Sequence, residues 1–369
     1  MKISSFHLLA GAALGGVTAC ARLATGPTTP PTTPQTTDPS SPWRIDGAES
    51  FDLKIPHHFF ARKHRTNPEE TVCHTQGLAL TRDHVVISCT LFNKDRKAET
   101  AQSYLLTGSR KEVLSPNPKD PHWKLIETTD QPPTMIGSKK PAPLGHPSGL
   151  APFLPFRNLV FANSTYGPEG YSQFRLFDPQ TMSLRQLLTP IPEHLGAVAP
   201  LLGRYLVGLT WNSEAFLVVD SKTGSWKKYP NDLAEHVDYQ ECEAVNDRTL
   251  LCTGNTRMPS ISPEYYFGRG HFIEVSGDDL NSFEFRLKNL LYAKGPMGRG
   301  VRWGNRNLGT ILLKNPLASP NRYGDYQTPE TLTFEGMAID REERFIYFLP
   351  ADIPGGKLIR YRLNDSHDI

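Results

Sequence analysis

The chain has 369 residues, enough for one large all-β domain with a leader and a linker, and its composition of 38% apolar and 21% charged residues is that of a globular protein. A formal net charge of +2 and the lack of a basic patch with interleaved aromatic residues exclude nucleic acid and an anionic membrane surface as partners.

Residues 1–21 have the features of a signal peptide. A short charged start precedes an apolar stretch, Leu8–Val17, that is too short to span a bilayer, and small residues follow it. The sequence Val17-Thr-Ala-Cys20 resembles the bacterial lipoprotein processing box, in which the cysteine is lipidated and becomes the new N-terminus. We therefore expect an extracytoplasmic protein that is attached to the membrane only through a lipid on Cys20. The alternative is ordinary cleavage after Ala21, which gives a secreted protein.

Residues 22–43 consist mainly of Thr, Pro and Ser, with almost no large apolar side chain. Such a segment cannot bury enough surface to offset the entropy lost on ordering. We expect a disordered tether here, followed by one folded domain over residues 44–369.

One seven-residue pattern recurs along that domain. It reads His74-Thr-Gln-Gly-Leu-Ala-Leu80 in its first copy and starts again at His146, His194, Tyr239 and Thr333. A β-branched or aliphatic run follows each copy within about a dozen residues, and further strand-like segments follow most of these runs. Repeated strand units at intervals of a few tens of residues predict a β-propeller in which the pattern forms the innermost strand of each blade.

The copies predict five blades. The fifth unit nearly ends after its third strand, near Tyr361, and the segment Phe51–Phe60 can supply the missing outer strand, which would join the two ends of the chain in one sheet. The interval from 239 to 333 is about twice the two before it. A sixth blade, beginning at Met297–Trp303 and Leu308–Leu313, is therefore the alternative.

Four cysteines lie within the predicted domain, and an even number in an exported protein favours disulfides. Cys242 and Cys252 flank a predicted hairpin turn and should lie opposite each other. Cys73 and Cys89 then pair by default, although their hairpin places them about two residues out of register. Free buried thiols are the alternative.

The first and third positions of an inner strand share a face that looks into the central channel. The first positions are His74, His146 and His194, followed by Tyr239 and Thr333, and the third positions include Gln76, Glu241 and Glu335. Three histidines and two glutamates should therefore converge near one mouth of the channel.

The second strand of each blade ends at the same mouth with a polar residue, and Trp211 and Arg257 lie beside two of them. The five polar residues are Asn93, Asn163, Asn212, Asn255 and Asp352. Polar groups that arrive from every blade at one rim predict a ligand site, to which Gln76 and Tyr239 also belong. The alternative is that the Asn and Asp residues only form turns.

Three chemical interpretations fit the converging side chains. His74, His146 and His194, together with Glu335 or Glu241, could bind one divalent metal ion, since imidazole and carboxylate suit Zn, Fe or Mn. One of these histidines, or Glu241 or Glu335, could instead act as a general acid or base. In the third interpretation the histidines only hydrogen-bond between blades.

The motif set resembles an uncharacterised family of exported bacterial and fungal proteins. The residues that carry the resemblance are His74-Thr-Gln-Gly, His146-Pro-Ser-Gly, Trp211-Asn-Ser, Tyr239-Gln-Glu-Cys and Phe348-Leu-Pro-Ala-Asp352. More loosely, Phe334-Glu-Gly-Met-Ala-Ile and Phe345-Ile-Tyr-Phe-Leu are similar to propellers of phytase-like esterases and lactonases. That second similarity implies hydrolase chemistry but transfers no catalytic residue, because the calcium-binding Asp/Asn pattern of those propellers is not clearly present.

Two classes of function follow. As a binding module, a monomeric propeller would hold a small polar ligand, a glycan or a protein partner at the channel mouth. As an enzyme, it would be a hydrolase or lyase, with or without a metal ion, acting at the same mouth. The chain has no Gly-x-Ser-x-Gly motif and no phosphate-binding loop, which favours binding.

Overall fold

The structure is a computed structural model. It describes residues 44–56, 73–91, 101–116, 120–130, 143–153, 158–165, 170–233, 237–257, 266–294, 336–349 and 356–363. Within these ranges the side chains of residues 44–48, 255–257, 266–269, 289–290 and 292–294 are not described. The predicted signal peptide and tether lie outside the described residues and stay predictions.

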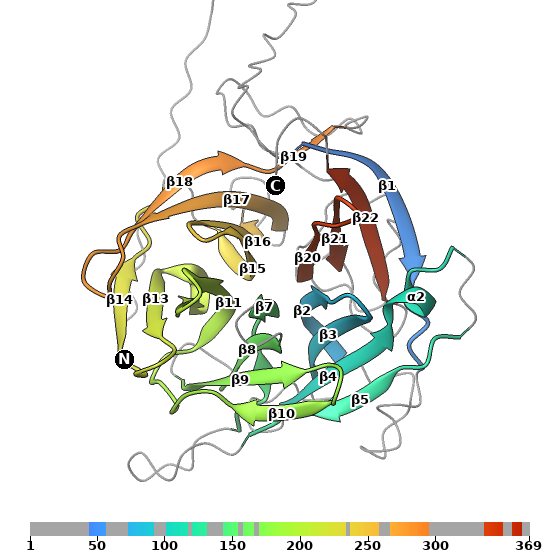
Figure 1. Cartoon of the computed structure of the whole chain (residues 1–369), viewed down its shortest axis with the longest axis horizontal. Helices are drawn as coiled ribbons and strands as arrows, with labels where there is room; N and C mark the ends of the chain where they lie inside the picture. The colour runs from blue at the N-terminus through green and yellow to red at the C-terminus, as the bar shows by residue number, and fades with distance from the viewer. Residues whose placement is uncertain are drawn as a thin grey trace, which may run out of the picture. The chain divides into compact units, whose positions relative to one another are not determined.

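Five antiparallel sheets form the five blades of a β-propeller (Figure 1). Blade 1 contains β2 (Cys73–Leu80), β3 (His84–Leu91), β4 (Gln102–Ser109) and β5 (Lys124–Glu127), with the short helix α2 (Arg110–Val113) after β4. Blade 2 contains β6 (His146–Pro147) and β7 (Ala151–Phe153), which both pair with β8 (Asn158–Ser164), and then β9 (Ser172–Asp178) and β10 (Ser183–Gln186).

Blades 3 and 4 are regular four-stranded meanders. Blade 3 contains β11 (Leu195–Leu201), β12 (Tyr205–Thr210), β13 (Ala215–Asp220) and β14 (Trp226–Pro230), with the short 3-10 helix η4 (Trp211–Ser213) between β12 and β13. Blade 4 contains β15 (Asp238–Asn246), β16 (Thr249–Arg257), β17 (Tyr266–Ser276) and β18 (Glu284–Leu290).

The fifth blade joins the two ends of the folded domain. It contains β20 (Gly336–Asp340), β21 (Phe345–Leu349), β22 (Lys357–Leu363) and β1 (Arg44–Asp52), and β19 (Tyr292–Lys294) pairs with β1 on the outside. The prediction of an N-terminal closing strand is therefore confirmed, but the strand covers 44–52, where 51–60 was predicted, and residues 57–60 lie outside the described residues. It ends before Lys54, whose positive φ of 48° breaks the extended backbone, and Pro56 removes a further backbone donor.

Inner and outer strands differ in burial because each blade is packed between two others. The central strands are buried on both faces, as in β3, where Val85, Val86 and Ile87 are fully buried. The outermost strand β14 instead alternates between exposed and half-buried side chains.

Each pair of neighbouring blades shares one apolar core cluster, which closes the ring at five. Blades 4 and 5 pack Leu251 and Phe272 against Met337 and Phe348, and blades 5 and 1 share a cluster that includes Tyr347. The other three junctions hold one cluster each. The alternative of a sixth blade between the fourth and fifth is wrong, because those two blades are already in direct contact.

Both predicted disulfides are present. Cys242 lies directly opposite Cys252, with 4.1 Å between the two Cα atoms. Cys73 lies opposite Leu91 and Cys89 opposite Thr75, so the second bridge spans the expected two-residue offset, with a Cα–Cα distance of 5.5 Å. Two disulfides are compatible with an extracytoplasmic location. Among the described residues, no helix has the length and apolarity needed to cross a bilayer.

Every inner strand of the first four blades is interrupted within the repeated motif. The strand register shifts at Gln76, at Gly196 and at Gln240, and in blade 2 the strand is divided between β6 and β7. A bulge of this kind turns the following side chains relative to the preceding ones. The side chains before and after the register shift therefore do not follow the simple alternation between the two faces of a strand. The position of the shift determines which side chains face the channel.

Candidate functional site

The innermost strand of blade 4 organises the channel. Strand β15 contacts the inner strands of the other four blades, which are β2, β7, β11 and β20. In Figure 1 the five inner strands lie around the middle of the ring. The first motif residues lie at one end of the channel, which we call the histidine mouth. The turns between the first and second strands lie at the other end, which we call the turn mouth.

Two of the three motif histidines meet at the histidine mouth and pack against a tryptophan. The ring centroids of His146 and His194 are 5.0 Å apart, and Trp211 lies 4.4 Å from the His194 ring and 5.9 Å from the His146 ring. His146 and His194 are 3% and 1% exposed, while His74 and Trp211 are half-buried. The predicted convergence therefore yields an aromatic cluster whose accessible edge consists of His74 and Trp211.

The imidazole of His146, within this cluster, is neutral at neutral pH. Burial lowers the pKa of His146 well below its ordinary value of 6.5, and the neighbouring His194 and His74 lower it further. A neutral imidazole can donate one hydrogen bond and accept another. The group therefore suits a polar ligand better than an anion that needs a positive partner.

Blade 4 carries a tyrosine at the position of these histidines. The Tyr239 hydroxyl lies 2.6 Å from Nδ1 of His271, and both residues are buried. The Tyr239 backbone N–H donates to Oγ of Ser213 at 2.7 Å, which joins blade 4 to η4 of blade 3. Tyr239 was predicted to bind ligand, but its hydroxyl is engaged inside its own blade.

Glu241 lies across the channel and joins three blades. Its Oε2 accepts the backbone N–H of Leu78 in blade 1 and of Leu150 in blade 2, both at 3.1 Å, and its Oε1 accepts the N–H of Cys242 at 3.2 Å. Inner strands have one unpaired edge, so these two N–H groups would otherwise face the channel without a strand partner. The side chain is completely buried.

Burial raises the pKa of the Glu241 carboxyl well above its ordinary value, while the three N–H donors and the nearby Glu243 act on it less strongly. The glycine at the fourth motif position of blade 2 makes this contact possible. A Cβ on Gly149 would lie 2.1 Å from Oε1 of Glu241. The recurrent glycine of the motif thus leaves room for the carboxylate.

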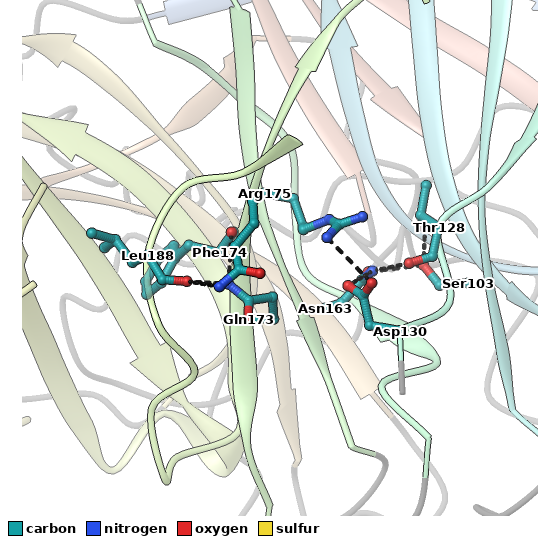
Figure 2. Close-up of polar contacts among 9 residues, drawn as sticks. Ser103, Thr128, Asp130, Asn163, Gln173, Phe174, Arg175 and Leu188 are labelled. Carbon is teal, nitrogen blue, oxygen red and sulfur yellow. Dashed lines mark hydrogen bonds and ion pairs between the residues drawn. The ribbon is translucent and has the colours of Figure 1, made fainter. Parts of the chain in front are cut away.

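Asn163 is used inside the protein rather than at a ligand surface (Figure 2). Its Oδ1 accepts from Oγ of Ser103 at 2.9 Å, and its Nδ2 donates to the carbonyl oxygen of Thr128 and to Oδ2 of Asp130 at 3.4 Å. Arg175 completes the group through an ion pair with Asp130 at 3.2 Å. These contacts tie blade 2 to blade 1, because an amide at a blade junction can satisfy groups on both sides.

The remaining predicted site residues lie in different environments. Gln76 is buried and its Nε2 donates to the Thr75 carbonyl oxygen at 3.0 Å. Asn212 is exposed and has a positive φ of 60°, which asparagine tolerates in tight turns. Asn93, Glu335 and Asp352 lie outside the described residues, and so do the side chains of Asn255 and Arg257.

Among the residues that the structure describes, no group of three His, Cys, Asp or Glu side chains is arranged to hold a metal ion. The possibility of one divalent metal at His74, His146 and His194 therefore stays a prediction from the sequence, as does the catalytic use of those histidines or of Glu241.

The turn mouth contains a cavity of about 330 Å³ that sequence reasoning missed. Residues from all five blades line it, together with Arg110 of α2. Glu243 is buried there, and its Oε2 accepts the Ile339 N–H at 2.8 Å. A signal was available in the sequence, because Glu243 occupies the fifth motif position, where the other four copies carry Leu78, Leu150, Val198 and Met337.

No family model matches the chain, and no curated protein matches it in sequence. Solved structures match at low identity. A glycosyl hydrolase from Bacteroides ovatus is 9% identical, with 79% of this chain and 84% of that chain covered and a TM-score of 0.48. Trypanosoma rangeli sialidase is 12% identical, with 79% and 44% covered and a TM-score of 0.41.

The β-propeller domain of the Trilobed protease from Pyrococcus furiosus is 12% identical, with 59% of this chain covered and a TM-score of 0.30. The present chain spans 57% of that protein and 32% of an acylaminoacyl peptidase from Pyrococcus horikoshii. At these identities the likeness concerns the fold alone and transfers no substrate or catalytic residue. The resemblance to an exported family stays a prediction.

Proposed function

We propose that the protein is a binding module that holds a small polar ligand, a glycan or a protein partner at the histidine mouth. The observation that supports this proposal is the packing of His146 and His194 against Trp211, with His74 and Trp211 accessible at the edge. Polar groups with few charges, set against an aromatic ring, are typical of small-molecule sites.

Among the three ligand classes, the chemistry of the cluster favours a glycan. The imidazole of His74 lies at the accessible edge, and a neutral imidazole can both donate to and accept from a hydroxyl group. Burial keeps the nearby His146 neutral, so it adds no charge to the site. The Trp211 ring adds an apolar face and one N–H donor. Neutral sugars present hydroxyl groups around an apolar ring face, so they complement both features.

The Trp211→Ala variant is expected to weaken glycan binding about tenfold or more, because the aromatic face is lost from the accessible edge of the cluster. The probe is a panel of neutral cello-, chito- and malto-oligosaccharides, with affinity measured by calorimetry. Trp226→Ala is the matched control, since Trp226 is 40% exposed on the outer strand β14, away from the channel.

Equal affinity in the two variants, or no binding of any oligosaccharide by the unmodified protein, would contradict the proposal. Cleavage of a bound oligosaccharide would instead favour the alternative function, a hydrolase or lyase at the same mouth.

We further propose that the protein acts as a monomer outside the cytoplasm and that its membrane attachment is a lipid on Cys20. The sequence Val17-Thr-Ala-Cys20 and the Thr/Pro-rich segment after it support this location. Mass spectrometry of the mature N-terminus is expected to find a diacylated Cys20. A chain that starts at Arg22, or an unmodified Cys20, would leave the secreted form as the correct one.

A further inference from the structure

The cavity at the turn mouth combines aliphatic lining residues with two buried carboxyl groups, Glu243 and Asp340, of which Asp340 is paired with Arg110. Its volume of about 330 Å³ lies at the lower end of the range for small-molecule sites. The apolar lining residues include Leu80, Pro152, Pro200, Leu201 and Ile339. Glu243 lies among them and is 6% exposed.

A carboxyl group at this position needs an explanation that the fold does not supply. The other four copies of the motif carry aliphatic residues there, and these fill the space without any cost of desolvation. Glu243 accepts one backbone N–H, from Ile339, across the junction between blades 4 and 5. A buried carboxylate usually requires a cationic partner as well.

One arginine of the cavity is already paired with carboxylates. Arg110 forms ion pairs with Asp340 and, at 3.3 Å, with Glu343 outside the cavity. Besides Glu243, the cavity is lined by three arginines and three carboxylates: Arg82, Arg110, Arg341, Asp247, Asp340 and Glu342. Counting Glu243, the lining therefore has four carboxyl groups and three guanidinium groups, and Arg341 is the guanidinium group that acts on Glu243.

We propose that this cavity binds a small organic monocation, a primary amine with a compact apolar body. Its ammonium group pairs with Glu243, and its apolar body contacts the aliphatic lining residues. The binding site is separate from the histidine mouth, because Glu241 lies across the channel between them.

Binding of an amine is coupled to ionisation of Glu243. The pKa of this carboxyl group is raised to about 7, mainly by burial and to a smaller extent by nearby Asp340, while the Ile339 N–H and Arg341 oppose the rise. Glu241 lies on the same strand as Glu243 and interacts with it electrostatically. Arg82, Asp247 and Glu342 line the cavity from the turns, and Arg110 lines it from α2. A bound ammonium favours the carboxylate, so binding releases a proton and strengthens about tenfold from pH 6 to pH 8.

The test is calorimetry of the purified protein with butylammonium chloride, with 1-butanol and sodium butyrate as the neutral and anionic probes of similar size. Butylammonium is expected to bind at least about tenfold more tightly than 1-butanol, and butyrate not to bind. At pH 7, titrations in two buffers of different ionisation enthalpy should reveal proton release. These measurements on the unmodified protein decide the proposal even if a variant fails to fold.

The matched variants are Glu243→Gln and Glu342→Gln. The first removes the buried charge and should abolish butylammonium binding, whereas the second removes an exposed carboxylate of the same cavity and should change the affinity less than about threefold. No binding of butylammonium, preference for butyrate, or full binding by folded Glu243→Gln would overturn the proposal. None of these results bears on the histidine mouth, where the probes are oligosaccharides.

Discussion

Glu241→Ala is expected to lower the free energy of unfolding by about 3–5 kcal/mol, the largest effect of any single side chain in the channel. The substitution leaves the N–H groups of Leu78 and Leu150 without their acceptor in a buried channel and empties the space of the side chain. Each unpaired buried donor costs about 1–3 kcal/mol. Such a loss is a large fraction of the stability of a typical domain.

Glu241→Gln separates the hydrogen bonds from the charge. The amide oxygen can take the place of Oε2 and still accept both N–H groups, but the amide NH₂ then faces the Cys242 N–H, which donates to Oε1. We expect a loss of about 1–2 kcal/mol. Denaturant unfolding measures both variants, and Glu274→Ala on the exposed side of β17 is the control, with a change below about 0.5 kcal/mol. An alanine variant within about 1 kcal/mol of the unmodified protein would show that Glu241 does not join the blades.

The second large effect concerns pH. Because the pKa of Glu243 is about 7 in the folded protein and about 4.5 when unfolded, the folded protein binds more protons between these values. The contribution of Glu243 is therefore most favourable below pH 4.5 and is lost as the pH rises through 7. The predicted loss is about 3 kcal/mol, from 1.36 kcal/mol for each pKa unit.

This contribution is measured as the difference in unfolding free energy between the unmodified protein and Glu243→Gln from pH 4.5 to pH 8. Contributions of the other titrating groups to the pH dependence are the same in both proteins and cancel in the difference. His146 is one such group: its lowered pKa destabilises the folded protein as the pH falls below 6.5. A difference that stays constant over this range would mean that the carboxyl group of Glu243 is not perturbed by burial.

The repeats were sufficient to predict the fold. Five copies of one inner strand, each followed by an aliphatic run, predicted the blades, and the short fifth unit predicted closure by the N-terminus. The predicted bounds of that closing strand were wrong, because the strand begins at Arg44 and ends at Asp52, before the positive φ of Lys54. That φ has no strong sequence signal, whereas Pro56 was a visible signal against a strand that continues to residue 60. Disulfide pairing followed from hairpin register, which neighbouring residues determine.

The candidate site was predictable only in part. The prediction that His146 lies beside His194 is confirmed, because residues at equivalent positions of consecutive blades are neighbours around the ring. It was harder to predict which side chains of the inner strands face the channel, because the strand register shifts within the motif. In blade 4 the shift comes just before Glu241, whose side chain accepts hydrogen bonds from two other blades. Asn163 also could not be assigned from pattern, because its partners come from a distant segment of blade 1.

The two mouths of the channel have different chemistry as a consequence. The carboxylate of Glu241 occupies the space between them and uses its oxygens on backbone donors. The histidine mouth therefore consists of an aromatic cluster that contains the neutral imidazole of His146, and the turn mouth contains Glu243 and guanidinium groups.

Histidine-selective ¹⁵N NMR at pH 6, with and without a bound oligosaccharide, tests the central claim most directly. Single-residue variants assign the imidazole signals. The account predicts a neutral imidazole for His146 and ligand-induced shifts at His74, His146 and His194, with the signals of His271 unchanged. A charged imidazolium at His146, or a bound oligosaccharide that leaves those three histidines unshifted, would contradict it.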